Sequence, residues 1–304
     1  MSLTPKVVQL HTRMLNDRRR TSKLLECIER IVRPGDIVVD IGTGTGILSV
    51  AAARAGARHV YAIERGLVRD VARKLFEANG LADRITLVPG DSTEVELPER
   101  ADVLVSELIG NDPLAENVVE ITLDARKRLL KPNARFIPGG LKVFGLLASM
   151  PESERSKLIF TPENLQDWQS WYGINFEPLS RVNRNTLQVF FLDPAALRGW
   201  KFLAAPELLA SLSFKTLKDQ HLENGRIIKA RGSGLLNCVI LYFELMLAPN
   251  RSFSTHPSAV DQSNHWLNPV YVFVNPHPLQ TGDKISLKYK YKVVDKGTWI
   301  DVSW

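Results

Sequence analysis

Apolar residues in the first half of the chain alternate between helical and strand spacing. Residues 14–32 carry apolar side chains three or four positions apart, which predicts a helix that stops before the Pro-Gly-Asp sequence at 34–36. Continuous apolar runs, typical of buried parallel strands, lie at 37–42, 59–64, 85–91 and 101–107. Helical patterns lie between or after them at 47–56, 71–81 and 118–132, and extended segments follow at 134–140 and 142–150. This alternation predicts a doubly wound α/β sheet of the Rossmann-like kind.

The second half of the chain has strand patterns with few helices between them. Extended apolar runs, separated by Pro, Gly and Asn, lie at 186–192, 235–247, 269–275 and 284–294. Helical patterns interrupt them at 163–176 and 193–200. We therefore expect two domains, an α/β domain over residues 1–150 and an antiparallel β-barrel over residues 151–304. The barrel would carry a helical insertion over about residues 165–205.

Composition narrows the class of protein without identifying it. Of the 304 residues, 44% are hydrophobic and 24% are charged, as in ordinary globular domains. No apolar run approaches the length of about 18 residues that a membrane helix needs, and no signal-peptide pattern opens the chain. Two cysteines predict no disulfide framework and favour a cytoplasmic protein. A net charge of +6 is too small to predict nucleic-acid binding, and no membrane contact or metal site is expected.

A glycine turn follows the first predicted strand. Gly42, Gly44 and Gly46 have the spacing G-x-G-x-G, which lets the backbone approach a ligand at the carboxyl end of the strand. A dinucleotide site needs G-x-G-x-x-G, so that a pyrophosphate can bind at the helix N-terminus. Asp40 precedes the turn, and a carboxylate there suits a cationic ligand better than a pyrophosphate.

Acidic residues also follow the next two strands. Glu64 ends the second strand, where it can accept hydrogen bonds from a ribose diol, and Asp91 follows the third, where it can accept from an adenine amino group. S-adenosylmethionine (AdoMet) has a cationic sulfonium, an amino group, a ribose and an adenine. We therefore expect AdoMet, in preference to a nicotinamide cofactor. The alternative, a turn that only packs helix on strand, does not explain the acidic strand ends.

The loop after the fourth strand contains two glutamates. Glu107 and Glu116 are separated by Gly110 and Pro113, and a turn at those residues could bring the two carboxylates together. Such a pair would repel unless a cation lay between them, and a planar guanidinium with five N–H donors suits it. In the alternative, Glu116 only occupies the first turn of the next helix, where a carboxylate is favoured. The loop by itself leaves both readings open.

Two distant segments join these motifs into one pattern. Residues 11–21 read HTRMLNDRRRT, and residues 253–273 contain Asn264, His265 and Trp266. Together with DIGTGTGIL at 40–48 and the glutamate loop, they resemble the protein arginine methyltransferase family. The resemblance covers nearly the whole chain. It lies in the order of the motifs, which on the N-terminal helix includes His11, Met14, Leu15, Asp17, Arg20 and Thr21.

The resemblance implies an activity and its residues. The chain would transfer methyl from AdoMet to the guanidino nitrogen of an arginine in a protein or peptide, with Glu107 and Glu116 clamping the guanidinium. Asp17 and His265 would pair and help to remove the proton, with Trp266 beside the substrate. Without the resemblance, Asp17 could be a solvated helix residue and the His-Trp pair simple packing.

The resemblance also implies cofactor contacts and a homodimer. Met14 would line the transfer channel and Arg20 would meet the AdoMet carboxylate. The further cofactor-binding positions are Asp40, Gly42, Gly44, Glu64, Asp91, Ser92 and Thr93. The segment 168–200 stands where the family carries its dimerisation arm.

This chain departs from the family pattern at several positions. It lacks tyrosines before His11, has Leu108 and Ile109 after the first glutamate where the family has Trp-Met, and has Asn264 in place of Thr. Two other functions therefore stay open: methyl transfer to a small cationic or guanidino molecule, and an inactive AdoMet-binding or regulatory protein.

Overall fold

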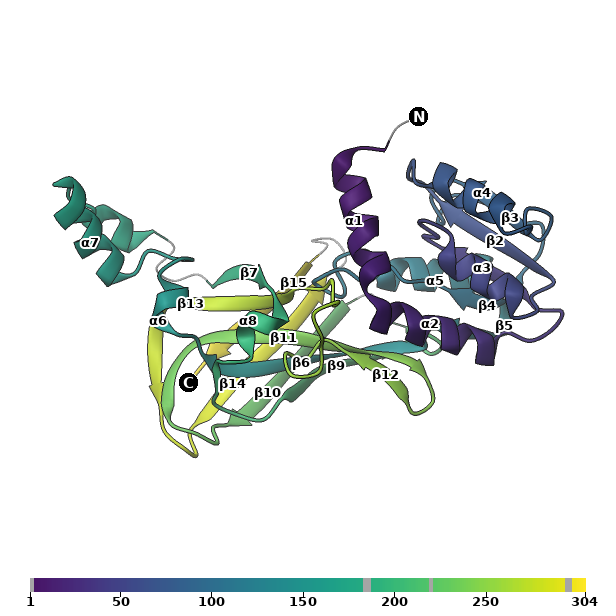
Figure 1. Ribbon diagram of the computed structural model, residues 1–304. Coiled ribbons are helices and arrows are strands. Elements are labelled where there is room, and N and C mark those ends of the chain that lie inside the picture. The colour runs from purple at the N-terminus through teal and green to yellow at the C-terminus, as the bar shows by residue number, and fades with distance from the viewer. Residues whose placement is uncertain (1–2, 183–186, 219–220, 293–296) are drawn as a thin grey trace.

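The computed structural model describes residues 3–182, 187–218, 221–292 and 297–304, and it contains one parallel and two antiparallel sheets. The parallel sheet and its helices form one end of an elongated molecule, and the antiparallel sheets form the other (Figure 1). In these described ranges, no helix has the length and apolar content to cross a membrane.

The doubly wound parallel sheet expected from the sequence is confirmed. Its strands, in spatial order, are β3 (Ile85–Pro89), β2 (His59–Glu64), β1 (Ile37–Ile41), β4 (Ala101–Val105) and β5 (Leu130–Ile137). Its helices are α3 (Ile47–Arg54), α4 (Arg69–Ala78) and α5 (Val118–Arg128). The strand order reverses between β1 and β4, so the loops after these two strands lie side by side at the edge where such sheets bind ligands.

Two helices, not one, precede the sheet. α1 (Pro5–Asn16) and α2 (Arg18–Ile31) meet at Asp17, whereas the sequence predicted one helix over 14–32. Asp17 ends α1 and also caps α2, because its side chain accepts a hydrogen bond from the backbone N–H of Arg20 at 3.0 Å. α2 buries Leu24 and Ile28 against the core, whereas α1 has no buried residue.

The second half forms two antiparallel sheets. The larger has the order β7 (Gln188–Leu192), β13 (Asn268–Leu279), β11 (Gly234–Ala248), β6 (Gly140–Ser149) and β8 (Lys201–Phe202), with β12 (Arg251–Ser254) on β11 and β9 (Glu207–Ser213) on β6. The smaller contains β10 (His221–Lys229), β14 (Lys284–Lys292) and β15 (Gly297–Ser303). No strand pairing closes them into a ring among the described residues, so the expected barrel is an open one. The expected strands 186–192 and 284–294 extend partly outside those residues.

β6 belongs to the antiparallel part of the molecule. It pairs with β11 over nine residues from Gly140 to Ala148, although the sequence places the end of the first domain near residue 150. The last strand of the parallel sheet ends at Ile137. We therefore propose that the boundary lies between Ile137 and Gly140.

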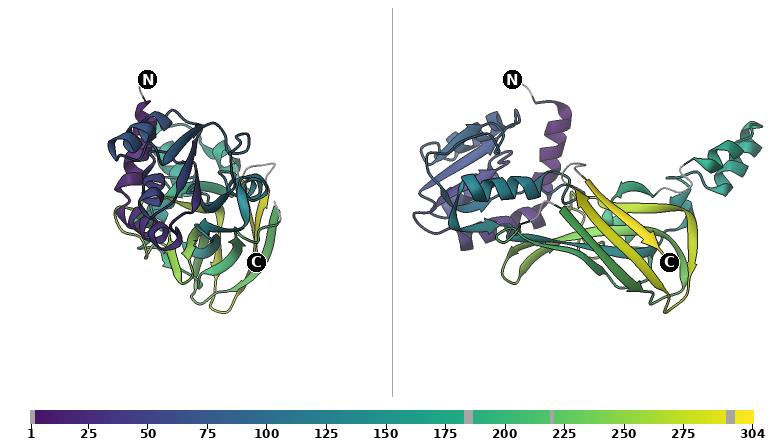
Figure 2. Two further views of the ribbon diagram at one scale, coloured as in Figure 1. Left: turned by 90° about the vertical axis from the view of Figure 1, so that its right-hand side faces the viewer. Right: turned by 180° about the vertical axis from the view of Figure 1, so that it is seen from behind.

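A helical segment extends from the far end of the antiparallel sheets. α6 (Glu152–Arg155) leads into α7 (Pro162–Tyr172) and a 3-10 turn, η1 (Glu177–Arg181), and α8 (Pro194–Leu197) returns toward the sheet. Figure 2 shows α7 standing away from the rest of the molecule. Neither α7 nor η1 has a buried residue. The expected arm, residues 165–205, includes positions 183–186, which lie outside the described residues.

Candidate functional site

The glycine turn forms the floor of a deep cavity. Gly42 and Gly44 have φ angles of +73° and +57°, a region in which residues with a side chain are strained. A Cβ atom at Gly42 would also lie 2.4 Å from the Leu108 side chain, so the loops after β1 and β4 approach each other closely here. The cavity has a volume of about 870 Å³, within the range of small-molecule sites, and both glycines line it.

Asp40 does not line this cavity, although the sequence placed it among the ligand contacts. Its side chain points into the protein and accepts hydrogen bonds from Thr43 Oγ1 at 2.7 Å and Ser49 Oγ at 2.6 Å. It is 1% exposed, and burial raises its pKa to about 6. Asp40 therefore holds the glycine turn onto α3.

Glu64 lies at the end of β2 and faces the cavity. One carboxylate oxygen accepts from Gly44 N at 3.0 Å and the other from Gly66 N at 2.6 Å. Each oxygen retains a lone pair for a ligand hydroxyl. The carboxylate is thus fixed by two backbone donors before any ligand arrives.

Asp91, Ser92 and Thr93, in the loop after β3, also line the cavity. Asp91 accepts from Thr93 N at 3.0 Å and from Thr93 Oγ1 at 2.8 Å, and these bonds, together with Arg65, lower its pKa. Ser92 is buried and Thr93 is exposed. Asp91 is therefore a carboxylate at neutral pH, with its position set by its own loop.

Glu107 is joined to Arg20 by a buried ion pair, and both residues line the cavity. The two side chains are 7% and 6% exposed. Arg20 also donates to the backbone oxygen of Met14 at 2.8 Å, while its Nε has no partner among the described residues. Burial raises the pKa of Glu107 to about 7; Arg20 opposes this increase, and the negative charge of Glu116 adds to it.

Glu116 lies in the loop and not in the helix that follows. α5 begins at Val118, so Glu116 is outside its first turn, contrary to the reading in which it only stabilises a helix. Its Oε1 would be 2.7 Å from a Cβ atom at Gly110, so the chain folds back on itself there. Glu107 and Glu116 line the same cavity. Glu116 is exposed to solvent on its outer side, but the protein covers its inner side. This partial burial raises the pKa of Glu116 as well.

Asp17 and His265 join the helical N-terminus to the antiparallel part. His265 Nδ1 lies 2.9 Å from Asp17 Oδ2, and the same oxygen accepts from His265 N at 3.2 Å. Asp17 is fully buried. Burial lowers the pKa of His265 and Asp17 opposes this decrease, so the imidazole tends toward the neutral form.

Trp266 packs beneath the glutamate loop. Its ring is 1% exposed, lies 4.3 Å from the His265 ring, and its Nε1 donates to Ile109 O at 2.7 Å. Trp266 still lines the cavity, as does Met14. These contacts support the glutamate loop. Trp266 therefore has the packing role that the sequence left open.

Sequence reasoning missed two further contacts of the glutamate loop. Asn111 Oδ1 accepts from Leu267 N at 2.8 Å. Asp112 accepts from Thr298 Oγ1 at 2.6 Å and from Thr298 N at 3.3 Å. A polar Asn-Asp pair between the glutamates was visible in the sequence, but nothing there indicated a partner 186 positions away. The antiparallel sheets thus hold the loop at several points.

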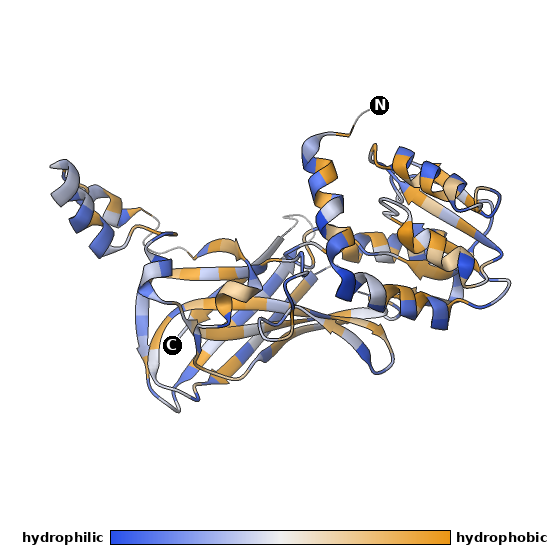
Figure 3. Cartoon of the chain, viewed as in Figure 1, coloured by the Kyte–Doolittle hydropathy of each residue, from blue (hydrophilic) through white to orange (hydrophobic). Residues whose placement is uncertain are grey.

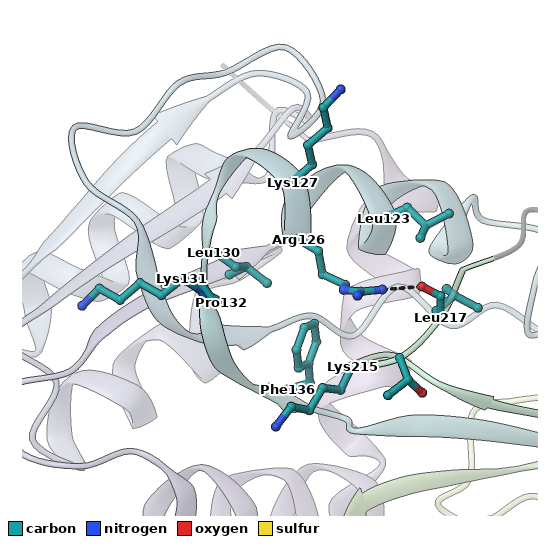
Figure 4. Close-up of a pocket in the computed structure, with 10 residues that line it drawn as sticks. Leu123, Arg126, Lys127, Leu130, Lys131, Pro132, Phe136, Lys215 and Leu217 are labelled. Atoms are coloured by element: carbon teal, nitrogen blue, oxygen red, sulfur yellow. Dashed lines mark hydrogen bonds between the residues drawn. The ribbon is translucent and has the colours of Figure 1, made fainter.

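A second hollow lies at the C-terminal end of α5, remote from these residues. Arg126, Lys127, Lys131 and Lys215 surround an apolar floor that includes Phe136. In Figure 4 the three lysines point away from one another, and Arg126 donates to the backbone oxygen of Leu217. This hollow is a contact between the two halves of the chain, and its cations do not converge on a ligand.

Known proteins resemble the chain in sequence and in fold. The family model "Ribosomal protein L11 methyltransferase (PrmA)" matches residues 18–178, and the model "Arginine methyltransferase oligomerization subdomain" matches residues 158–298. The "Probable protein arginine N-methyltransferase 6" of Arabidopsis thaliana is 32% identical over 221 residues, which are 71% of this chain and 48% of that protein. The chain therefore spans about half the length of that relative.

Two other matches cover more of both chains. The "Arginine N(omega)-methyltransferase" of Streptomyces achromogenes subsp. streptozoticus is 29% identical over 93% of this chain and 76% of its own. A solved structure described as "Trypanosoma brucei PRMT1 enzyme-prozyme heterotetrameric complex with AdoHcy" has a TM-score of 0.78 at 22% identity. It covers 96% of each chain, so the two share their fold.

Proposed function

The chain belongs to the protein arginine methyltransferase family, and we propose that it transfers a methyl group from AdoMet to a guanidino nitrogen of an arginine in a protein or peptide. One observation carries the proposal. Glu107 and Glu116 face the cavity that also contains the glycine turn and Glu64. A site for a cationic cofactor and a pair of carboxylates for a cationic acceptor are therefore parts of one space.

The cavity residues suit AdoMet. The buried guanidinium of Arg20 has an unpartnered Nε and suits a carboxylate, and Glu64 presents acceptors to a diol. Asp91 and Ser92 would contact the adenine, and Met14 the methyl channel. When bound, AdoMet supplies an electrophilic methyl group. The chain's own contribution is to hold an acceptor nitrogen in line with it.

The two glutamates make arginine a better nucleophile. A guanidinium has a pKa above about 12, so it is cationic and weakly nucleophilic at neutral pH. Two carboxylates can localise positive charge on one nitrogen and leave electron density on another. Such positioning contributes several kcal/mol to catalysis. Glu107 must be deprotonated for this, and its raised pKa also makes it a suitable acceptor for the proton that leaves.

Asp17 and His265 are positioned to assist in two ways. Their contact fixes the junction of α1 and α2, which carries Met14 and Arg20, against the loop that carries Trp266. The neutral tendency of His265 also allows it to accept a proton on the way to water. Both roles depend on the same 2.9 Å contact.

A small guanidino molecule is the second candidate acceptor. The Streptomyces relative is named for methylation of arginine, not of a protein, and it matches most of this chain. The test is an assay with radiolabelled AdoMet on cell lysate and on free arginine, followed by acid hydrolysis of the protein fraction. Methylarginine in hydrolysed protein supports the proposal. Label only in free arginine supports the second candidate, and no label supports an inactive binding protein.

The assembly and location form part of the proposal. The exposed aromatic side chains of α7, Trp171 and Tyr172, are 64% and 63% exposed, and a second copy of the chain would bury them. We therefore propose a homodimer formed through the segment 168–200. The two cysteines, Cys27 and Cys238, are buried and unpaired, which suits the cytoplasm.

A further inference from the structure

The outer face of the small antiparallel sheet carries a row of lysines. Along β14, Lys284, Lys288, Lys290 and Lys292 alternate with apolar and aromatic side chains that face inward. Lys229 of β10 stands directly opposite Lys284. Figure 3 shows the alternation of polar and apolar residues along these strands. We call these five lysines the lysine face.

Few carboxylates balance this charge. Glu223 and Asp301 are the acidic residues on the outer positions of the three strands, and both contact Lys290, at 3.4 Å and 3.5 Å. The other four lysines of the face have no ion pair among the described residues. The face therefore has an excess of three positive charges over the described positions.

The arrangement is unfavourable for the isolated sheet. Two residues of a strand span about 6.8 Å, which is less than the screening length of about 8 Å in physiological salt, so Lys288, Lys290 and Lys292 repel one another. Like charges directly opposite each other, as at Lys229 and Lys284, also destabilise a strand pair. An anionic partner would offset the repulsion along β14 and the repulsion between Lys229 and Lys284.

The lysine face ends beside a strand that contacts the acceptor loop from its buried side. Lys292 pairs with Gly297 at the start of β15, and the next residue, Thr298, binds Asp112 between the two catalytic glutamates. From Lys292 the face runs along β14 for eight residues, or about 27 Å. A substrate whose arginine lies at the glutamates could therefore extend along this face.

We propose that the lysine face binds an acidic segment of the protein substrate, separated in sequence from the acceptor arginine. This inference rests on the proposed function. A peptide is favoured over a nucleic acid because the outer positions of the face contain no arginine, which is the side chain best suited to phosphate. They also present two aromatic rings, the indole of Trp299 and the imidazole of His221, on separate strands, whereas single-stranded nucleic acids stack on successive aromatic side chains.

The test uses the full chain and three synthetic peptides. Each carries one arginine, a Gly/Ser spacer of about eight residues, which spans up to about 27 Å, and six glutamates, six glutamines or six lysines. The triple variant Lys284→Gln, Lys288→Gln, Lys292→Gln should raise KM for the glutamate peptide about tenfold, as expected for three exposed ion pairs. It should leave kcat, and KM for the glutamine peptide, unchanged.

A matched variant controls for net charge. Lys74→Gln, Lys127→Gln, Lys201→Gln removes the same number of exposed lysines from other surfaces and should leave KM for every peptide unchanged. Equal KM values for the glutamate and glutamine peptides with the unmodified protein would overturn the inference. So would an equal loss in the control variant.

A direct binding measurement separates this inference from the proposed function. Fluorescence anisotropy of a labelled glutamate peptide without arginine requires no methyl transfer. Binding that weakens with salt and in the triple variant supports the docking face, even where no arginine is methylated. Stronger binding of a single-stranded oligonucleotide at the same site, or no binding of the acidic peptide, would contradict it.

Discussion

Arg20 and Glu107 form a buried ion pair across the wall of the cavity, so the first glutamate of the proposed clamp already holds a guanidinium that belongs to the protein itself. An acceptor arginine would replace that contact. The cofactor carboxylate is a natural alternative partner for Arg20, because the Nε atom of Arg20 has no partner among the described residues. In the proposed reaction, Arg20 would therefore contact the cofactor and Glu107 the acceptor arginine.

The glutamate pair should be required for transfer but not for cofactor binding. Glu107→Gln and Glu116→Gln should each lower kcat by about 10²–10³-fold, roughly 3–4 kcal/mol of transition-state stabilisation, because an amide no longer localises the charge of the guanidinium. AdoMet affinity, measured by calorimetry, should stay within about twofold for Glu116→Gln, since this residue has no contact with Arg20. Glu77→Gln on α4 is a suitable control. Near-normal transfer by Glu116→Gln would refute the clamp.

The decrease of kcat/KM on the acidic side of the pH profile should reflect the protonation of Glu107. Its pKa is raised to about 7 from an ordinary value of 4.5, so the proton is retained up to neutral pH and the carboxylate forms above it. With saturating AdoMet, kcat/KM for an arginine peptide should rise as pH increases through about 7 and fall as pH decreases. The residual activity of Glu107→Gln should lack this decrease on the acidic side. A profile that stays flat from pH 6 to 8 in the unmodified protein would contradict the assignment.

Substitution of Glu64 should affect AdoMet affinity, whereas substitution of Asp40 should affect the stability of the fold. Glu64→Ala should weaken AdoMet binding by about 1–3 kcal/mol, since it removes a charged acceptor in the cavity. Asp40→Ala leaves the hydroxyls of Thr43 and Ser49 without their shared acceptor, so it should lower the free energy of unfolding. Calorimetry and denaturant unfolding separate the effects. Unchanged AdoMet affinity in Glu64→Ala would exclude the ribose contact.

The contact between Thr298 and Asp112 should influence the glutamate loop from a distance. Thr298→Val keeps the side-chain shape but removes the hydroxyl that binds Asp112, at a cost of about 1–3 kcal/mol in stability. If the contact positions the glutamates, kcat should fall below that of Thr281→Val, an exposed control, while AdoMet affinity stays constant. A stability loss without any change in kcat would limit the contact to a structural role.

The arm should control assembly. Trp171→Ala with Tyr172→Ala removes two side chains that are exposed in a single chain, so the fold should be retained while a dimer dissociates. Light scattering should then give a mass near the 34.1 kDa of one chain, against twice that mass for the unmodified protein. Trp304→Ala, at an exposed site off the arm, should remain dimeric. A monomeric unmodified protein at high concentration would exclude the homodimer.

Local patterns in the sequence were sufficient for the parallel sheet and for the helices between its strands. The period of apolar residues separated its strands from its helices, and the carboxyl ends of parallel strands share one edge, so Glu64, Asp91 and Glu107 could be assigned to one site before any coordinates. The glycine spacing also indicated a close approach of backbone and ligand, because only glycine adopts those φ angles without strain.

Tertiary structure alone decided which way particular side chains face and which distant segments meet. Asp40 adjoins the glycine turn in sequence but does not line the cavity, because Thr43 of the turn and Ser49 of α3 hold its carboxylate inside the protein. β6 follows the α/β half but pairs with β11, almost a hundred residues later. Arg20 meets Glu107, and Thr298 meets Asp112, across separations of 87 and 186 positions. Such contacts depend on how whole elements pack, whereas sequence periodicity reports only the few residues that share one turn or strand.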